Sequence, residues 1–131
     1  MSPPRLFLMA GGGTGGHVIP ALAVARCLRD KGHDVLFVGT REGLEARLVP
    51  AEGFPIEWVR IGGLKRVGPA RLLRTLAQLP VAVMKVWRLI RARRPAAVFS
   101  MGGYAAGPAV LAAWLRRLPV VVMEPNAMPG I

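Results

Sequence analysis

Short apolar runs alternate along this chain with longer segments in which apolar residues recur every three or four positions. The apolar runs cover residues 5–9, 34–39, 56–61, 97–100 and 119–124. The periodic segments between them cover residues 18–31, 42–48, 69–94 and 108–117. Short runs of this kind predict buried strands, and the longer periodicity predicts helices with one apolar face. The alternation is typical of an α/β fold with a Rossmann-like, doubly wound parallel sheet.

Prolines and glycines set the expected ends of the helices. Pro20 falls in the first turn of its helix, where a missing N–H is tolerated, and Gly32 ends the same helix. Pro80 lies in the middle of the segment 69–94. That segment therefore predicts two helices or one kinked helix.

The connections between the strands predict where a ligand binds. Right-handed crossovers give the strand order 3-2-1-4-5, which reverses between the first and fourth strands. Ligands of such sheets bind in the crevice at this reversal. Two glycine-rich loops, residues 10–17 and 101–107, leave the carboxyl ends of these two strands. We therefore expect the two loops to meet at one site.

The first loop contains five glycines and Thr14. Glycine lets backbone N–H groups approach a ligand closely, and the N-terminus of the following helix favours an anion. Gly11, Gly13 and Gly16 fit the dinucleotide fingerprint G-x-G-x-x-G, which alone is a weak signal. A P-loop is excluded because His17 stands where it requires lysine. The alternative to an anion site is a tight structural turn.

Other side chains expected at this edge have chemistry that suits catalysis or sugar binding. His17 begins a helix, which disfavours the imidazolium, so it is either a general base or a residue that caps the helix or orients a ligand. Tyr104, in the second loop, either binds ligand or packs. Glu124 and Asn126 follow the fifth strand. Glu124 accepts a proton, binds a sugar hydroxyl or holds a loop by hydrogen bonds.

Charge is unevenly distributed along the 131 residues, a length that suits one domain. Residues 1–57 carry six basic and six acidic side chains, whereas residues 58–131 carry twelve basic and one acidic side chain and hold the whole net charge of +11. This segregation indicates a face that meets an anionic partner: nucleic acid, phosphorylated substrate or lipid. Nucleic acid is disfavoured, because aromatic residues are few and no recognition motif occurs.

The segment 69–94 is basic and amphipathic, with a tryptophan, and such a helix can lie on an anionic bilayer surface. The alternative is that its apolar row belongs to the core and its arginines are solvated. The membrane hypothesis requires only that Leu79, Met84 and Trp87 be exposed. No run of eighteen apolar residues without a charge occurs, and the N-terminus does not resemble a signal peptide. The single cysteine, Cys27, excludes an internal disulfide and a metal site built on several cysteines.

These residues resemble the MurG family of glycosyltransferases, which add N-acetylglucosamine to lipid I in peptidoglycan synthesis. The resemblance rests on residues 12–25 (GGTGGHVIPALAVA), residues 101–104 (MGGY) and the pair Glu124-x-Asn126. Shorter matches extend it over residues 39–40, 45, 48–50, 63–64, 107–108, 112–114 and 119–121. It spans essentially the whole chain, and the two loops together with Glu-x-Asn are highly specific.

The resemblance implies that residues 1–131 form the N-terminal, acceptor-binding Rossmann-like domain of a GT-B glycosyltransferase whose UDP-sugar-binding domain lies outside this chain. It implies inverting transfer of N-acetylglucosamine from UDP-N-acetylglucosamine to the C4 hydroxyl of lipid-linked N-acetylmuramyl-pentapeptide, with no cofactor and no metal. It also implies a peripheral position on the cytoplasmic face of the bacterial inner membrane, against its anionic surface. The chain alone is expected not to turn over substrate.

The resemblance further implies roles for single residues. The acceptor pyrophosphate would be held by Gly13, Thr14, Gly15, Gly16, Gly102, Gly103, Tyr104 and Gly107. Thr14 would also lie near the donor phosphates and Asn126 near the transferred sugar, while His17 and Glu124 are the candidates for catalysis. The membrane would be contacted by Leu79, Met84, Trp87, Arg88 and Trp114.

Two other classes of protein remain open from the residues alone. A nicotinamide-dependent oxidoreductase would use the same first loop. Such a site requires an acid at the end of the second strand, where this chain has Thr40 and Arg41, although Arg41 would suit a 2′-phosphate. The other class is a non-catalytic module that binds membrane surfaces.

Overall fold

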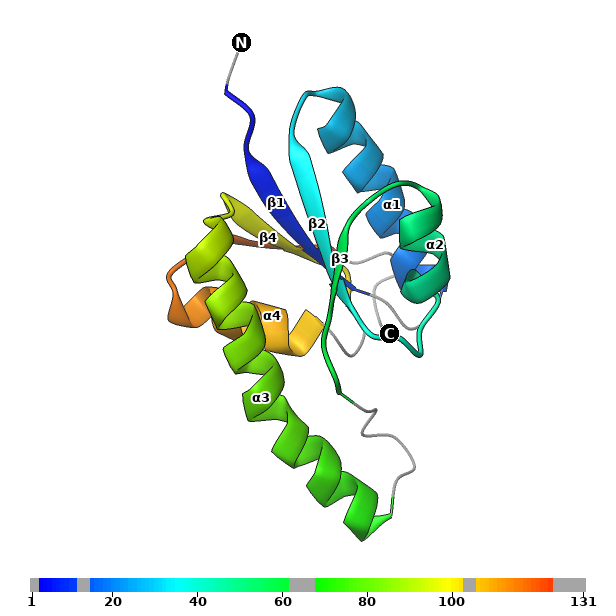
Figure 1. The fold of residues 1–131 in the computed structure, drawn as a ribbon, viewed down its shortest axis with the longest axis vertical. Coiled ribbons are helices and arrows are strands. Elements are labelled where there is room, and N and C mark those ends of the chain that lie inside the picture. Colours follow the sequence, from blue (N-terminus) through cyan, green and yellow to red (C-terminus); the bar gives the residue numbers. More distant parts are fainter. Residues whose placement is uncertain (1–2, 12–14, 62–67, 103–105, 124–131) are drawn as a thin grey trace, which may run out of the picture.

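The computed structural model describes residues 3–11, 15–61, 68–102 and 106–123. In chain order its elements are β1 (Leu6–Ala10), α1 (Gly15–Asp30), β2 (Asp34–Gly39), α2 (Glu45–Ala51), β3 (Ile56–Trp58), α3 (Pro69–Arg93), β4 (Ala97–Ser100), α4 (Ala106–Leu115) and β5 (Val120–Val122). The strands form one sheet with helices on both of its faces (Figure 1). The predicted α/β class is therefore confirmed.

The sheet has the strand order β3-β2-β1-β4-β5, and each neighbouring pair of strands is parallel. The predicted order, with its reversal between the first and fourth strands, is confirmed. β1 lies at the centre, where Ala10 is in register with Val38 of β2 and with Ser100 of β4. The carboxyl ends of these three strands therefore lie side by side.

Each face of the sheet carries its own hydrophobic core. On one face, Leu8 and Val98 pack with Val86 and Ile90 of α3 and with the alanines of α4. On the other face, buried residues of β1 and β2 pack with α1, α2 and Phe54. Because successive side chains of a strand point to opposite faces, the near-continuous apolar runs of β1 and β2 supply both cores.

Several elements end at other residues than the sequence predicts. The third strand was expected over residues 56–61 but ends at Trp58, because its only partner, β2, ends at Gly39 opposite Trp58. The second helix begins at Glu45 rather than at residue 42, after a turn. The segment around Pro80 forms one helix, α3, so of the two expected alternatives the structure shows a single helix and not two. Pro80 is exposed there.

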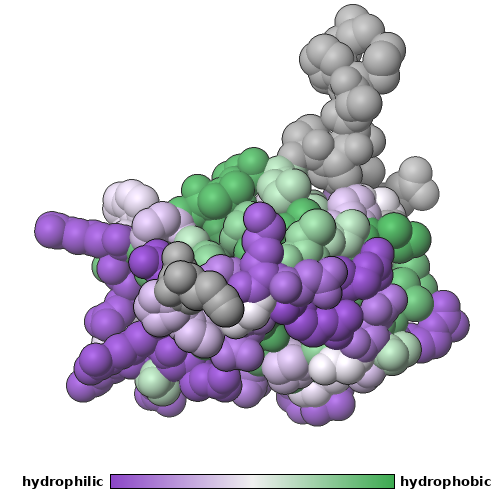
Figure 2. All heavy atoms as spheres, turned by 90° about the horizontal axis from the view of Figure 1, so that it is seen from above, coloured by the Kyte–Doolittle hydropathy of each residue, from purple (hydrophilic) through white to green (hydrophobic). Residues whose placement is uncertain are grey.

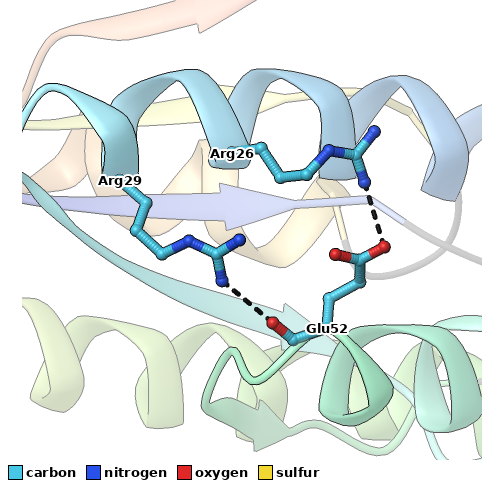
Figure 3. Close-up of polar contacts among 3 residues, drawn as sticks. All are labelled: Arg26, Arg29 and Glu52. Carbon is cyan, nitrogen blue, oxygen red and sulfur yellow. Dashed lines mark hydrogen bonds and ion pairs between the residues drawn. The ribbon is translucent and has the colours of Figure 1, made fainter.

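A polar connection joins α1 to the turn after α2. Arg26 Nη1 lies 3.0 Å from Glu52 Oε1, and Arg29 Nη1 donates a hydrogen bond of 2.9 Å to the Glu52 carbonyl (Figure 3). The Arg29 guanidinium also lies over the Phe54 ring, 4.4 Å from its centroid. These contacts cover the outer edge of the hydrophobic core that lies between the sheet, α1 and α2.

The carboxyl end of β2 is fixed by a buried acid. Glu45 is 1% exposed, and its Oε2 accepts hydrogen bonds from Thr40 N at 3.0 Å and Thr40 Oγ1 at 3.3 Å. Gly39 leaves room for this carboxylate, since a Cβ atom there would lie 2.5 Å from Glu45 Cγ.

We therefore expect Gly39→Ala to lower the free energy of unfolding by about 1–3 kcal/mol, measured by urea denaturation.

The matched control is Gly107→Ala, which adds the same methyl group where no atom lies within 4 Å. It is expected to leave stability unchanged or to raise it slightly, because alanine is the better helix former. Equal stability of the two variants would contradict the assigned role of Gly39.

Candidate functional site

The two glycine-rich loops begin side by side. Met101 N donates a hydrogen bond of 2.8 Å to the Ala10 carbonyl, which carries the β1–β4 pairing to the ends of both strands. A Cβ atom on Gly11 would lie 2.7 Å from the Cβ of Met101 and 3.2 Å from the Gly102 carbonyl oxygen. The two backbones are thus in contact where the strand order reverses. The expected meeting of the loops is confirmed for their described residues.

His17 connects the loops through its side chain. Gly102 has φ +90°, in the left-handed region that favours glycine, and a Cβ atom there would lie 3.2 Å from Cδ2 and Nε2 of the His17 ring. The imidazole of the first turn of α1 therefore packs against the backbone that follows β4. The structure brings His17 to the switch point, as its position after the first loop predicts.

Two helices begin at this same edge of the sheet. α1 starts at Gly15, directly after the first loop, and α4 starts at Ala106, directly after the second. Neither helix has an acidic residue in its first turn. The first N–H groups of a helix lack partners within it and carry its partial positive charge, so both helices favour an anion at this edge.

The remaining predicted site residues fall into two groups. Gly15 and Gly16 open α1, and Gly107 lies exposed in the first turn of α4. The other residues predicted to bind or react lie outside the described part of the chain: Gly13, Thr14, Gly103, Tyr104, Glu124 and Asn126.

Glu45 is a residue that pattern analysis did not single out. Its carboxylate lies beside Thr40 at the end of β2, where a nicotinamide site needs an acid for the ribose hydroxyls. Burial and the hydrogen bonds from Thr40 commit this carboxylate to holding the β2–α2 turn. The arrangement therefore disfavours the oxidoreductase alternative. The sequence signal was a glutamate five residues after Thr40, at the start of a helix.

α3 has two apolar faces, and only one of them packs on the sheet. Ala82, Val83, Val86 and Ile90 are buried. The first half of the helix extends beyond the sheet (Figure 1), so Leu76 is exposed even though it shares a face with Val83, seven residues later. Leu73, Val81 and Met84 are exposed on the other side of the helix. The exposed fractions are 69% for Leu73, 50% for Leu76, 70% for Val81 and 48% for Met84.

The residues predicted to contact a membrane divide between these two faces. Met84 and Arg88 are exposed, and so is Trp114 on α4 at 70%. Leu79 and Trp87 are partly buried and pack against the core, so the expectation that they are exposed is wrong. Arg116 lies over the Trp87 ring at 5.1 Å and Arg91 at 5.9 Å, which adds to its cover. No helix in the described residues is long and apolar enough to cross a bilayer.

The amino ends of the strands form the edge of the sheet opposite the glycine loops. Hydrophilic side chains occupy the front of this end of the molecule, and hydrophobic ones gather at its upper and right-hand edges (Figure 2). A hollow of about 450 Å³ lies here, lined by Pro4, Arg5, Leu6, Asp34, Arg93, Arg94 and Ala96. These residues stand at the amino ends of β1, β2 and β4, so the hollow is separate from the glycine loops.

Known proteins match both the sequence and the fold of this chain. The sequence model of the glycosyltransferase family 28 N-terminal domain matches residues 7–131. A relative from Solibacter usitatus (strain Ellin6076) is 63% identical over 124 residues, which cover 95% of this chain and 34% of the relative. It is named UDP-N-acetylglucosamine–N-acetylmuramyl-(pentapeptide) pyrophosphoryl-undecaprenol N-acetylglucosamine transferase. A protein of the same name from Nitrosococcus oceani is 49% identical and is covered over 35% of its length.

Solved structures of glycosyltransferases are among those that match the fold. The crystal structure of Acinetobacter baumannii MurG superposes with a TM-score of 0.84 at 38% identity, over 97% of this chain and 37% of that one. The calicheamicin glycosyltransferase CalG4, at 20% identity and a TM-score of 0.66, shares the fold alone, over 92% of this chain and 32% of its own. The chain spans about a third of the length of these proteins. It belongs to glycosyltransferase family 28, whose N-terminal domain it carries.

Proposed function

We propose that this chain is the acceptor-binding domain of an inverting glycosyltransferase. The complete enzyme would transfer N-acetylglucosamine from UDP-N-acetylglucosamine to the C4 hydroxyl of lipid-linked N-acetylmuramyl-pentapeptide, which produces lipid II. Support comes from the family match and from relatives whose name states this donor and this acceptor. The observation that carries the proposal is the contact between the two glycine loops at the switch point.

The chemistry of the acceptor fits this point of contact. A pyrophosphate carries negative charge on several oxygens, and backbone N–H groups at two helix N-termini can share that charge. Gly11 and Gly102 allow the two loops to touch, because a side chain on either would meet Met101 or His17, and this contact brings the N-termini of α1 and α4 to one edge of the sheet. In this proposal Gly13, Thr14 and Gly103 complete the cradle.

Roles at the reacting end of the acceptor follow from the same placement. His17, packed on Gly102, lies beside the proposed pyrophosphate site and is a candidate to orient the acceptor or take its proton. Glu124 and Asn126 follow β5, whose carboxyl end lies at the same edge of the sheet. We propose Glu124 as the other candidate base and Asn126 as a contact to the transferred sugar, with Thr14 near the donor phosphates.

We further propose that the exposed apolar face of α3 rests on the cytoplasmic surface of the inner membrane. Leu73, Leu76, Val81 and Met84 would enter the boundary between headgroups and acyl chains, with Trp114 on the neighbouring helix. Arg74, Lys85 and Arg88 are exposed on the same helix, and the sequence has no acid between Trp58 and Met123. Basic residues near an anionic bilayer each contribute about 1 kcal/mol to binding.

Substitution of Gly102 tests the acceptor site. In Gly102→Ala the new methyl group opposes the positive φ and meets the His17 ring. We expect about a tenfold loss of affinity for a soluble muramyl pyrophosphate acceptor analogue, measured by isothermal titration calorimetry. The control Gly68→Ala adds a methyl group into open space at the start of α3 and should bind normally. Failure of the unsubstituted chain to bind the analogue would sink the proposed function.

Replacing exposed apolar residues of α3 by glutamate tests the membrane proposal. Leu73→Glu with Val81→Glu removes two exposed apolar contacts and adds two negative charges. We expect about a tenfold weaker binding to vesicles of phosphatidylglycerol and phosphatidylcholine in a sedimentation assay. Pure phosphatidylcholine vesicles should bind the unsubstituted chain less well, because they lack the anionic headgroups.

The matched control for this pair is Ile19→Glu with Ala23→Glu, which changes exposed residues of α1 on the other face of the sheet. This control should sediment with vesicles as the unsubstituted chain does. If both double variants bind vesicles equally well, the exposed face of α3 is not the contact surface.

A further inference from the structure

An arginine at the carboxyl edge of the sheet is held by an aromatic ring, and its guanidinium donates no hydrogen bond to any residue that the structure describes. Arg41 follows β2, and its guanidinium lies over the ring of Trp58, the last residue of β3, at 4.6 Å from the centroid. Arg41 is exposed and Trp58 is partly buried. The Trp58 ring therefore holds the Arg41 guanidinium in place and leaves it accessible to solvent.

Stacking leaves this guanidinium free to bind an anion. A guanidinium that lies on an aromatic ring uses its face, while its N–H donors point outward in the plane of the group and match a carboxylate in geometry. Arg29 stacks on Phe54 in a similar way, but it donates to the Glu52 carbonyl. The guanidinium of Arg41 makes no hydrogen bond or ion pair with the residues that the structure describes.

A second cation contacts the same tryptophan. Lys85 of α3 donates a hydrogen bond from Nζ to the Trp58 carbonyl oxygen. Glu57 precedes Trp58, and the alternation of the strand turns its side chain to the other face of the sheet. Glu42 follows Arg41 and is exposed, without an ion pair to it. The surroundings of Trp58 therefore favour a negatively charged group.

This arginine lies within reach of the proposed pyrophosphate site. Trp58 is in register with Gly39 of β2, and the neighbouring Val38 is in register with Ala10 at the end of β1. Adjacent strands are about 4.8 Å apart, so Trp58 lies about 10 Å from the first glycine loop. A peptide of five residues spans up to about 17 Å when extended.

We propose that Arg41, supported by Trp58, binds the terminal carboxylate of the peptide carried by the acceptor. The inference rests on the proposed function, since the name of the relative from Solibacter usitatus describes a muramyl pentapeptide acceptor. In this arrangement the glycine loops bind the pyrophosphate. Arg41, at the carboxyl ends of β2 and β3, binds the far end of the peptide. Arg41 is thus a specificity-determining residue, which distinguishes an acceptor that ends in a carboxylate from one that does not.

Three soluble acceptor analogues, each with a short lipid on the muramyl pyrophosphate, test this inference by calorimetry. One carries the pentapeptide with a free carboxylate, one carries it as the carboxamide, and one lacks the peptide. The unsubstituted chain is expected to bind the carboxylate about tenfold more tightly than the carboxamide. Arg41→Gln should abolish that difference, and Arg41→Lys, which keeps the charge but loses the planar fork, should retain only part of it.

The matched control is Arg47→Gln, which removes the same charge from an exposed position on α2 and should keep the tenfold difference. The inference is overturned if the unsubstituted chain binds both peptide analogues equally, or if Arg41→Gln still distinguishes them. The peptide-free analogue separates this failure from that of the proposed function, because its binding depends on the glycine loops alone. If it does not bind the unsubstituted chain, the acceptor site itself has been misassigned.

Discussion

The contact between the ends of β1 and β4 is the constraint on which the rest of this structure depends. Gly11 and Gly102 have no room for side chains, because Met101 and His17 occupy the space that a Cβ atom would need. Two helices, α1 and α4, can therefore begin at the same edge of the sheet. A single loop of this kind would be an ordinary strand-to-helix turn, and it is the pair of helix N-termini on which the proposed anion site depends.

Different edges and faces of the one sheet carry the glycine loops, the stacked arginine and the amphipathic helix α3. The carboxyl edge carries the glycine loops and, farther along, the stacked pair of Arg41 and Trp58. The face covered by α1 and α2 is closed by the contacts to Glu52 (Figure 3). The other face carries α3, whose free apolar side is flanked by arginine and lysine. The lipid-linked, negatively charged acceptor that we propose suits this division, because its lipid and its charged groups would meet different parts of the domain.

Much of the fold could be predicted because its determinants are local or follow from chain handedness. The periodicity located the nine elements found in the described part of the chain, and right-handed crossovers gave the strand order. Errors arose where a partner decides the outcome. β3 ends at Trp58 because β2 ends opposite it. The sequence left open whether Pro80 divides α3, and the structure has a single helix there. Glu45 was missed because nothing in its spacing shows that its carboxylate folds back onto Thr40.

The sequence by itself determined the class of fold, the meeting of the two glycine loops and the concentration of positive charge in the second half of the chain. Those properties depend on residue order and on the handedness of L-amino acids. The periodicity marked the apolar row of α3, but only the tertiary structure decided that Val83, Val86 and Ile90 of this row are buried while Leu72 and Leu76 are exposed. The reason is that the first half of α3 extends beyond the sheet (Figure 1). The tertiary structure also decided that Trp87 packs against the core and that Arg41 rests on Trp58, since both contacts join residues from separate elements.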